Sequence, residues 1–439
     1  MTLQEIKGKL VQVIDEHKEE IILIGQTILR NPELGYQEEK TSELVRSQFD
    51  KLGIPYDYPV AVSGVKARLD GRARNCNVCV IGEMDAIKCA GSPIANAMGV
   101  AHACGHHAQM AAMLGAAIGL VMSGVMKELD GSVTFMATPA EEFIELDYRK
   151  KLKQEGIIRY FGGKQELIAT GAFDDVDMAM MLHAQPESTG SLDSIPPKQL
   201  YVRGNNLGFL AKTVRFRGKA AHGSTPFDGI NALNAASLAI LGVHANRETF
   251  REEEKIRIHP IITKGGDVVN SVPDEVIIDT YIRGASFEAI QKGNHTVERA
   301  ALGACEMVGA KVEFEKIPGY LPLKESQELS EVMEQNAALL IGKENLIYGE
   351  QITGSTDIGD LSSILPVIQP SITGFTGLLH SKEFNVADEE TAYVLPAKLL
   401  ALTVAELLYD HAWLACMVKE NFTPQMTKEE YMAYLESTY

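Results

Sequence analysis

The sequence predicts an α/β protein in which a core of buried strands and helices is interrupted by a ferredoxin-like unit. The chain has 439 residues, of which 45% are apolar, more than one hydrophobic core usually holds. Four short apolar runs alternate with helical patterns, and a segment between them has a different rhythm of strands and helices. We therefore expect residues 1–198 and 318–439 to form two halves of one domain, with residues 199–317 inserted between them.

The core prediction depends on the four apolar runs. Runs without polar alternation are typical of strands that are covered on both faces, and helical patterns such as 41–52 and 111–122 separate them. The runs read "CNVCVIG", "SVTFMAT", "VDMAMML" and "VIQPSIT".

The inserted segment has the order strand, helix, strand, strand, helix, strand. This βαββαβ order is typical of a ferredoxin-like unit. We expect strands at 209–218, 256–264, 274–283 and 310–317, and helices at 230–246 and 286–308.

Charge and composition exclude some partners. Lys plus Arg total 41 against 59 Asp plus Glu, so the formal net charge is -18, which repels nucleic acid and anionic lipid. The uncharged stretch 108–126 contains three glycines, Gln109 and Ser123, so it is expected to be a buried helix rather than a membrane span. The charged N-terminal pattern lacks the features of a secretory signal, and the six cysteines are too sparse for a disulfide framework. We expect a cytoplasmic protein with reduced thiols and neither a nucleic-acid nor a membrane partner.

Residues with metal-binding side chains follow the predicted strands. Ligands collect beyond the carboxyl ends of strands in open α/β sheets, and thiol, imidazole and carboxylate groups together are typical of a transition-metal site. The residues after the four runs, together with two that precede the uncharged helix in "HACGHHAQM", are Glu83, Asp85, Glu141, Glu142, His183, His380, Cys104 and His106.

Each of these residues also has an ordinary structural interpretation. Cys104 could pack in the core, His183 could be a core histidine with a backbone partner, and paired glutamates are often a solvated turn. Their coincidence at strand ends favours a metal site. Two other hypotheses remain open: Cys104 as a nucleophile with His106 or His107 as its base, and a non-catalytic, metal-dependent binding protein.

Motifs along nearly the whole chain carry a family resemblance. "NPELGYQEE", "GEMDA", "HACGHH", "PAEE", "AAHGSTP" and "NSVPDEVIIDTYIRG" occur in this order. With these motifs in this order, the chain resembles the metallo-aminoacylase and carboxypeptidase family. Within that family it is similar to the amidohydrolase branch, which contains hippurate hydrolase, auxin-conjugate hydrolases and aminobenzoyl-glutamate hydrolase. The resemblance implies a metallopeptidase-type catalytic domain around a central mixed sheet, with the insertion as a lid and dimerisation domain of a homodimer.

The resemblance also implies roles for individual residues. Two divalent ions, Mn or Zn, would be held with a bridging Cys104 thiolate, Glu141 would be the general base, and Asp85 would orient a ligating imidazole. The substrate would be a small amide with a free carboxylate: an N-acyl amino acid, an aminobenzoyl-glutamate-like conjugate or a dipeptide. The implied metal ligands are Cys104, His106, Glu142, His183 and His380, and the implied substrate contacts are His222, Asn270 and Arg283.

The chain departs from the family pattern at three positions. Many relatives read GHD after the cysteine, with another histidine two positions on, whereas this chain has His107 and Gln109. Glu83 stands where the carboxypeptidase branch has a metal-binding histidine. The roles of His107 and Glu83 therefore stay open. From the residues alone, Arg283 could also form a surface salt bridge and His222 could be a plain loop histidine.

Overall fold

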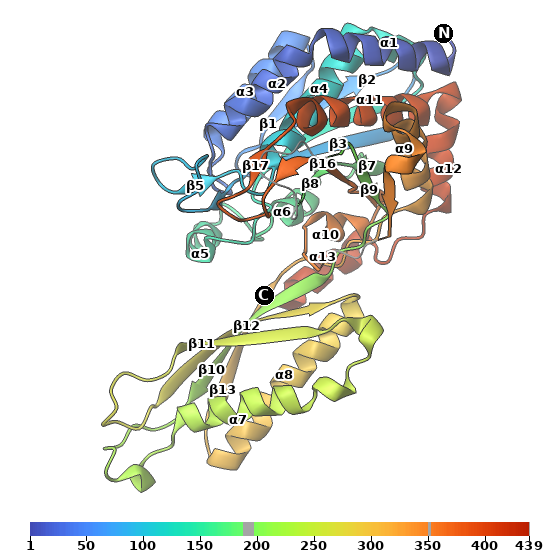
Figure 1. The fold of residues 1–439 in the computed structure, drawn as a ribbon. Helices are drawn as coiled ribbons and strands as arrows, with labels where there is room; N and C mark the ends of the chain where they lie inside the picture. Colours follow the sequence, from blue (N-terminus) through green and yellow to red (C-terminus); the bar gives the residue numbers. More distant parts are fainter. Residues whose placement is uncertain (188–196, 350–352, 439) are drawn as a thin grey trace. The chain divides into compact units, whose positions relative to one another are not determined.

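The computed structural model describes residues 1–187, 197–349 and 353–438, which form two compact units (Figure 1). Unit 1 consists of Met1–Asn205, Lys324–Gln351 and Leu361–Gln425. Unit 2 consists of Asn206–Leu323, Ile352–Asp360 and Met426–Tyr439. Two segments of the C-terminal part, 352–360 and 426–439, thus group with the inserted segment, and the role of unit 2 as a lid and dimerisation domain stays a prediction.

A mixed six-stranded sheet forms the centre of unit 1. Strand β3 pairs in parallel with β6 and β7, whereas β2 pairs antiparallel with β1 and β6, so the predicted mixed sheet is confirmed. The first three apolar runs form β3, β6 and β7, and every residue of these strands is buried. In spatial order the strands are β1 (Tyr56–Val60), β2 (Gly64–Asp70), β6 (Ser132–Thr138), β3 (Asn77–Glu83), β7 (Met178–Met180) and β15 (Val367–Ile368).

The fourth apolar run is not one strand. It divides at Gln369 and Pro370 into β15, which pairs with β7, and β16 (Ser371–Thr376), which belongs to a second sheet. Proline cannot donate a ladder hydrogen bond, which explains the break. The second sheet pairs β16 in parallel with β8 (His183–Glu187), so His183 begins a strand instead of closing one. Its other strands are β9 (Leu200–Val202), β14 (Leu346–Tyr348) and β17 (Asn385–Val386).

Helix α4 (His106–Met122) is the buried central helix of unit 1. It packs against β3 and against the helices α2 and α11, as Figure 1 shows, and its residues from His106 to Leu120 are buried. The uncharged stretch is therefore a core helix, as predicted. One described helical stretch, Glu390–Leu408, is long and apolar enough to cross a membrane, and 89% of its apolar window is buried inside the structure. The helices of unit 1 further include α1 (Leu3–Glu16), α2 (Lys18–Leu29), α3 (Glu39–Leu52), α5 (Leu146–Gln154), α6 (Gly163–Ala169), α9 (Gln327–Ile341), α11 (Leu395–Leu408) and α12 (Trp413–Asn421).

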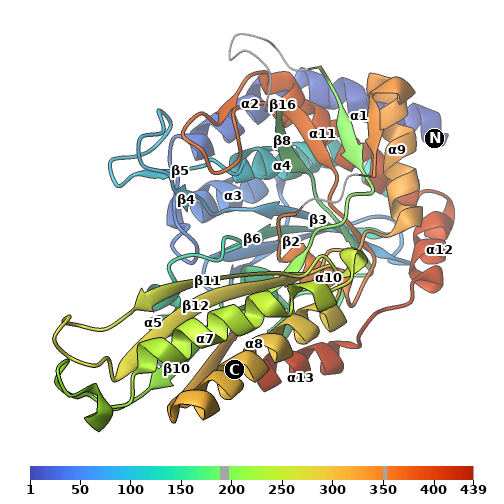
Figure 2. The same ribbon diagram turned by 60° about the horizontal axis from the view of Figure 1, so that its bottom comes forward.

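Unit 2 has the predicted ferredoxin-like arrangement. Its sheet has the order β11-β12-β10-β13 with all neighbours antiparallel, and α7 and α8 lie side by side against it (Figure 2). The alternating burial of β12 reflects one face packed on these helices. The elements are β10 (Gly208–Arg217), α7 (Ala232–Ala245), β11 (Arg257–Lys264), β12 (Glu275–Gly284), α8 (Phe287–Val308) and β13 (Lys311–Pro318), and α13 (Lys428–Thr438) contacts β13.

Candidate metal centre

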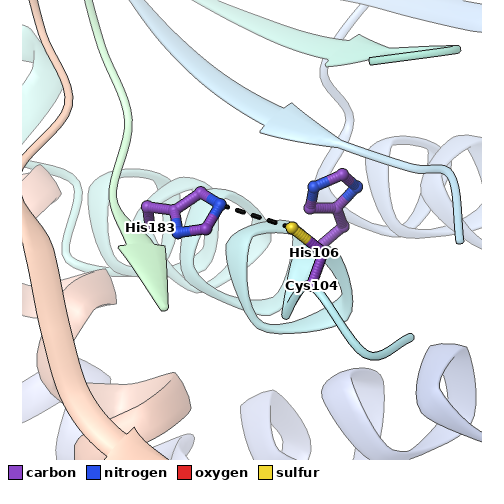
Figure 3. Close-up of side chains that lie close together, drawn as sticks. All are labelled: Cys104, His106 and His183. Carbon is purple, nitrogen blue, oxygen red and sulfur yellow. Dashed lines mark hydrogen bonds between the residues drawn. The ribbon is translucent and has the colours of Figure 1, made fainter. Parts of the chain in front are cut away.

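The turn before α4 brings a thiol and an imidazole together. Gly105 adopts a left-handed conformation with φ of 89°, and a Cβ there would lie 2.5 Å from the Cβ of Ala184. Glycine therefore fits this turn, which places Cys104 just before the helix and His106 in its first position. His183, at the start of β8, points its Nε2 at the Cys104 Sγ from 3.6 Å (Figure 3).

Three groups of side chains offer ligand atoms within 4.8 Å of one another. The structure brings together all five predicted ligands, and Cys104 belongs to two of the groups. Two donor sets that share one sulfur have the arrangement that a bridging thiolate needs. The groups are Cys104, His106 and His183; Cys104, Glu142 and His380; and Glu83, His106 and Glu141.

The surroundings of His106 fit a metal ligand. Its Nδ1 lies 2.8 Å from the carbonyl oxygen of Asp85 and 3.1 Å from the Asp85 Oδ1. Its Nε2 is buried and makes no hydrogen bond to a described residue, although Glu83 Oε2 is 3.2 Å away. An imidazole that donates from Nδ1 to a carboxylate presents the Nε2 lone pair to a metal. Asp85 also accepts a hydrogen bond from the Glu142 N–H at 2.9 Å, so one carboxylate positions two of the predicted ligands.

The charges around Cys104 favour a cation. Burial disfavours the Cys104 thiolate, but His106 and His183 hold the pKa of this thiol well below its ordinary value. Burial, reinforced by Cys104, raises the pKa of Glu142 to about 7. Hydrogen bonds to Cys104 and Glu142 raise the pKa of His380 to about 11. The anionic donors thus raise the pKa of the neighbouring imidazoles, and a divalent ion would compete with protons for the same donor atoms.

The loop that carries Glu141 and Glu142 is fixed by two charged side chains that the sequence analysis missed. Glu38 accepts a hydrogen bond from the Ala140 N–H at 2.9 Å, and burial raises the pKa of Glu38 to about 7. The fully buried Arg149 donates to the carbonyl oxygens of Phe161 and Glu142. The motif "NPELGYQEE" contains Glu38 and is the one sequence signal that could have pointed to it.

The structure also places Glu83 and His107. Glu83 Oε1 lies 2.6 Å from Lys164 Nζ, and Gln109 Nε2 donates to Glu83 Oε2 at 2.8 Å. The fully buried His107 ring packs 5.5 Å from the His102 ring and belongs to none of the three ligand groups. Burial holds the pKa of His107 well below its ordinary value, so the ring is neutral and belongs to the core.

The three predicted substrate contacts lie in unit 2. Asn270 Nδ2 is 3.1 Å from His222 Nε2, so these two side chains form a pair. Arg283 Nη1 donates to Ser355 Oγ at 2.7 Å, and its guanidinium lies 5.5 Å from the centre of the Phe209 ring. Burial lowers the pKa of Arg283, and the hydrogen bond described above joins its guanidinium to a hydroxyl and not to a carboxylate. The arrangement of Arg283 is therefore not the surface salt bridge of the alternative interpretation.

Replacing Asp85 by asparagine is expected to weaken divalent-metal binding by about 10- to 100-fold, because the side chain that orients His106 loses its charge. The dissociation constant of Mn²⁺ or Zn²⁺, measured by competition with a chelating dye, checks this. Asp70→Asn, at an exposed ion pair with Arg74, is the matched control and should leave metal affinity unchanged. Unchanged affinity of the Asp85 variant would contradict its orienting role.

The chain is similar to known proteins along most of its length. The chain matches peptidase family M20/M25/M40 over residues 79–406. It is 26% identical to human Xaa-Arg dipeptidase over 99% of this chain and 96% of that protein. It is 27% identical to the IAA-amino acid hydrolase ILR1-like 4 of Arabidopsis thaliana over 78% of this chain and 74% of that protein.

A solved structure shares the fold. The YXEP protein of Bacillus subtilis, a dinuclear metal binding peptidase from the M20 family, superposes with a TM-score of 0.68 at 22% identity, covering 90% of this chain and 99% of that one. The family match covers most of the chain and includes the thiol, imidazole and carboxylate groups described above. The chain belongs to peptidase family M20/M25/M40 and is a metal-dependent enzyme of the amidohydrolase and peptidase type.

Proposed function

We propose that this chain is a two-metal amidohydrolase that cleaves the amide bond of an N-acyl amino acid, an aminobenzoyl-glutamate-like conjugate or a dipeptide. The observation that carries the proposal is the pair of ligand groups that share Cys104. The names of the Xaa-Arg dipeptidase and the IAA-amino acid hydrolase support the substrate class, because both describe hydrolysis of a bond to an amino acid.

One ion would be held by Cys104, His106 and His183, and the other by Cys104, Glu142 and His380. Divalent ions bound there supply Lewis acidity toward the amide carbonyl and acidify water. The thiolate favours Zn²⁺ on grounds of softness, while the family resemblance favours Mn²⁺. A bound ion would compete with protons for these imidazole donors, so metal binding is expected to weaken as the pH falls.

Glu141 is the proposed general base. It is 7% exposed and its Oε2 lies 3.9 Å from His106 Nε2, so its carboxylate borders the ligand groups. The carboxylate takes a proton from the attacking water as the water oxygen bonds to the amide carbon. It then gives this proton to the nitrogen as the C–N bond breaks, so the amine leaves neutral and no covalent enzyme intermediate is needed.

Unit 2 is proposed to hold the substrate. Arg283 would bind its free carboxylate, because a planar guanidinium pairs with a carboxylate through two hydrogen bonds. His222 and Asn270 would contact the scissile carbonyl. We further propose a homodimer formed through unit 2. We also propose a cytoplasmic location, which the six free cysteines support.

Replacing Arg283 by glutamine is expected to lower kcat/KM by about 10- to 100-fold, mainly through KM, because a charge-assisted hydrogen bond of about 1.5–3 kcal/mol is lost. Steady-state kinetics on a substrate with a free carboxylate and on its methyl ester check this, since the loss should be confined to the free acid. Arg299→Gln, at an exposed arginine on α8 of the same unit, is the matched control and should leave kcat/KM unchanged on both substrates. Equal losses on acid and ester would contradict the assignment.

The proposed function is tested by measuring amino acid released from N-acyl amino acids, aminobenzoyl-glutamate and dipeptides. Chelated enzyme is compared with enzyme restored by Mn²⁺ or Zn²⁺, and metal-dependent release is the expected result. A second candidate, Cys104 as nucleophile, is favoured by the lowered pKa of its thiol and by His183 at 3.6 Å. Release that survives chelation would support it. Tight binding of an amide without release under any metal would support a binding protein instead.

A further inference from the structure

The carboxylate of Glu83 is part of a buried ion pair beside the candidate metal centre. Glu83 and Lys164 are both fully buried, and Lys164 Nζ lies 2.6 Å from Glu83 Oε1. Gln109, which is 3% exposed, donates from Nε2 to Glu83 Oε2 at 2.8 Å and accepts the Glu83 N–H through Oε1 at 3.2 Å. Each oxygen of this carboxylate therefore has a donor from the protein itself.

Glu83 nevertheless faces the metal donors. Its Oε2 lies 3.2 Å from His106 Nε2, the nitrogen that makes no hydrogen bond to a described residue. Together with Glu141 these residues form the third donor group, with ligand atoms within 4.8 Å of one another. Two carboxylates and one imidazole in a buried position have the donor chemistry of a divalent-cation site.

The Lys164 ammonium explains why this group need not take an ion. An ammonium on Glu83 Oε1 repels a divalent ion on the same carboxylate, and buried charges are screened little. Without Lys164, Glu83 would be a buried carboxylate with no cation, which is strongly unfavourable. A divalent ion held by the carboxylates of Glu83 and Glu141 would then restore the charge balance, because the single Nε2 lone pair of His106 would already bind the ion of a Cys104 group.

We propose that Lys164 is the resident cation of the Glu83–His106–Glu141 group and confines divalent ions to the two groups that contain Cys104. Glu83 is then a positioning residue and not a metal ligand in the native chain. The inference rests on the proposed metal centre. It makes Lys164 a determinant of how many ions the centre binds and where they bind.

The test counts metal ions in full-length Lys164→Met and native protein. Equilibrium dialysis against Co²⁺, followed by metal analysis, gives the number bound per chain, and the Tm difference with and without Co²⁺ gives a second readout. We expect K164M to bind one more ion than the native chain and to show a larger Co²⁺-induced rise in Tm. The double variant Glu83→Gln with Lys164→Met should lose both gains, and Lys127→Met, at an exposed lysine, should behave as the native chain.

Two results would overturn the inference. The first is K164M with the native number of ions and the native Tm response. The second is Glu83→Gln with one ion fewer than the native chain, which would make Glu83 a ligand already. Glu83→Gln keeps a hydrogen-bond partner for Lys164, so this variant still tests the inference if K164M does not fold. The inference predicts that K164M and the native chain differ in the number of bound ions, whereas the proposed function predicts that the native chain binds two ions. Each prediction can therefore fail without the other.

Discussion

Replacing Glu141 by glutamine is expected to lower kcat by about 10³-fold while the metal content stays unchanged. Glutamine has nearly the same shape as glutamate but cannot accept and return a proton, and general acid–base catalysis typically contributes about 10²- to 10⁴-fold. Single-turnover release of the amino acid, together with metal analysis of the same sample, separates loss of the base from loss of the metals.

The control for this variant is Glu155→Gln, at an exposed glutamate just after α5, which should keep native kcat. A Glu141→Gln enzyme that keeps kcat within a few-fold of native would show that another group handles the proton. Loss of metal from Glu141→Gln would instead show that Glu141 is a metal ligand. Its carboxylate lies within a group of donor atoms that includes His106.

Replacing Cys104 by serine is expected to remove most bound metal and to lower activity by at least about 10³-fold. The His106 and His183 side chains hold the pKa of the thiol low, so cysteine supplies an anionic donor shared by both ligand groups. A serine hydroxyl stays protonated at neutral pH and is a poor bridging donor. Metal analysis after dialysis and the rate of substrate cleavage are the measurements.

Cys305→Ser provides the control for the thiol itself. Cys305 is also a buried free cysteine, but it lies on α8 of unit 2 and belongs to none of the ligand groups. Activity lost in Cys104→Ser with full metal content would favour the nucleophile hypothesis. Native activity and native metal content in that variant would contradict both roles.

Local patterns were sufficient to predict much of the fold. The uninterrupted apolar runs predicted β3 and β6, and the alternation of strands and helices in 209–317 predicted the ferredoxin-like unit of unit 2. Hydrophobic periodicity carries this information because each element buries a defined face. The division of the fourth run into two sheets was missed. It depends on Pro370 and on the pairing of β16 with β8, a contact between segments far apart in the sequence.

The candidate site was predictable where residue type decides the chemistry. Few side chains bind metals, so Cys104, His106 and His183 could be selected at the ends of elements, and the structure brings them together. Partners that act through packing were not predictable. Lys164 meets Glu83 across 81 residues, and Arg149 reaches backbone carbonyls that no sequence pattern specifies. Such contacts exist only once the strands and loops are assembled.

The measurement that tests the central claim most directly is a metal titration of chelated enzyme during cleavage of its best substrate. Amino acid release is followed as Mn²⁺ or Zn²⁺ is added in known equivalents. The two Cys104 groups predict no release without metal and a rise that saturates near two equivalents per chain. Release at the full rate from metal-free enzyme would contradict the account.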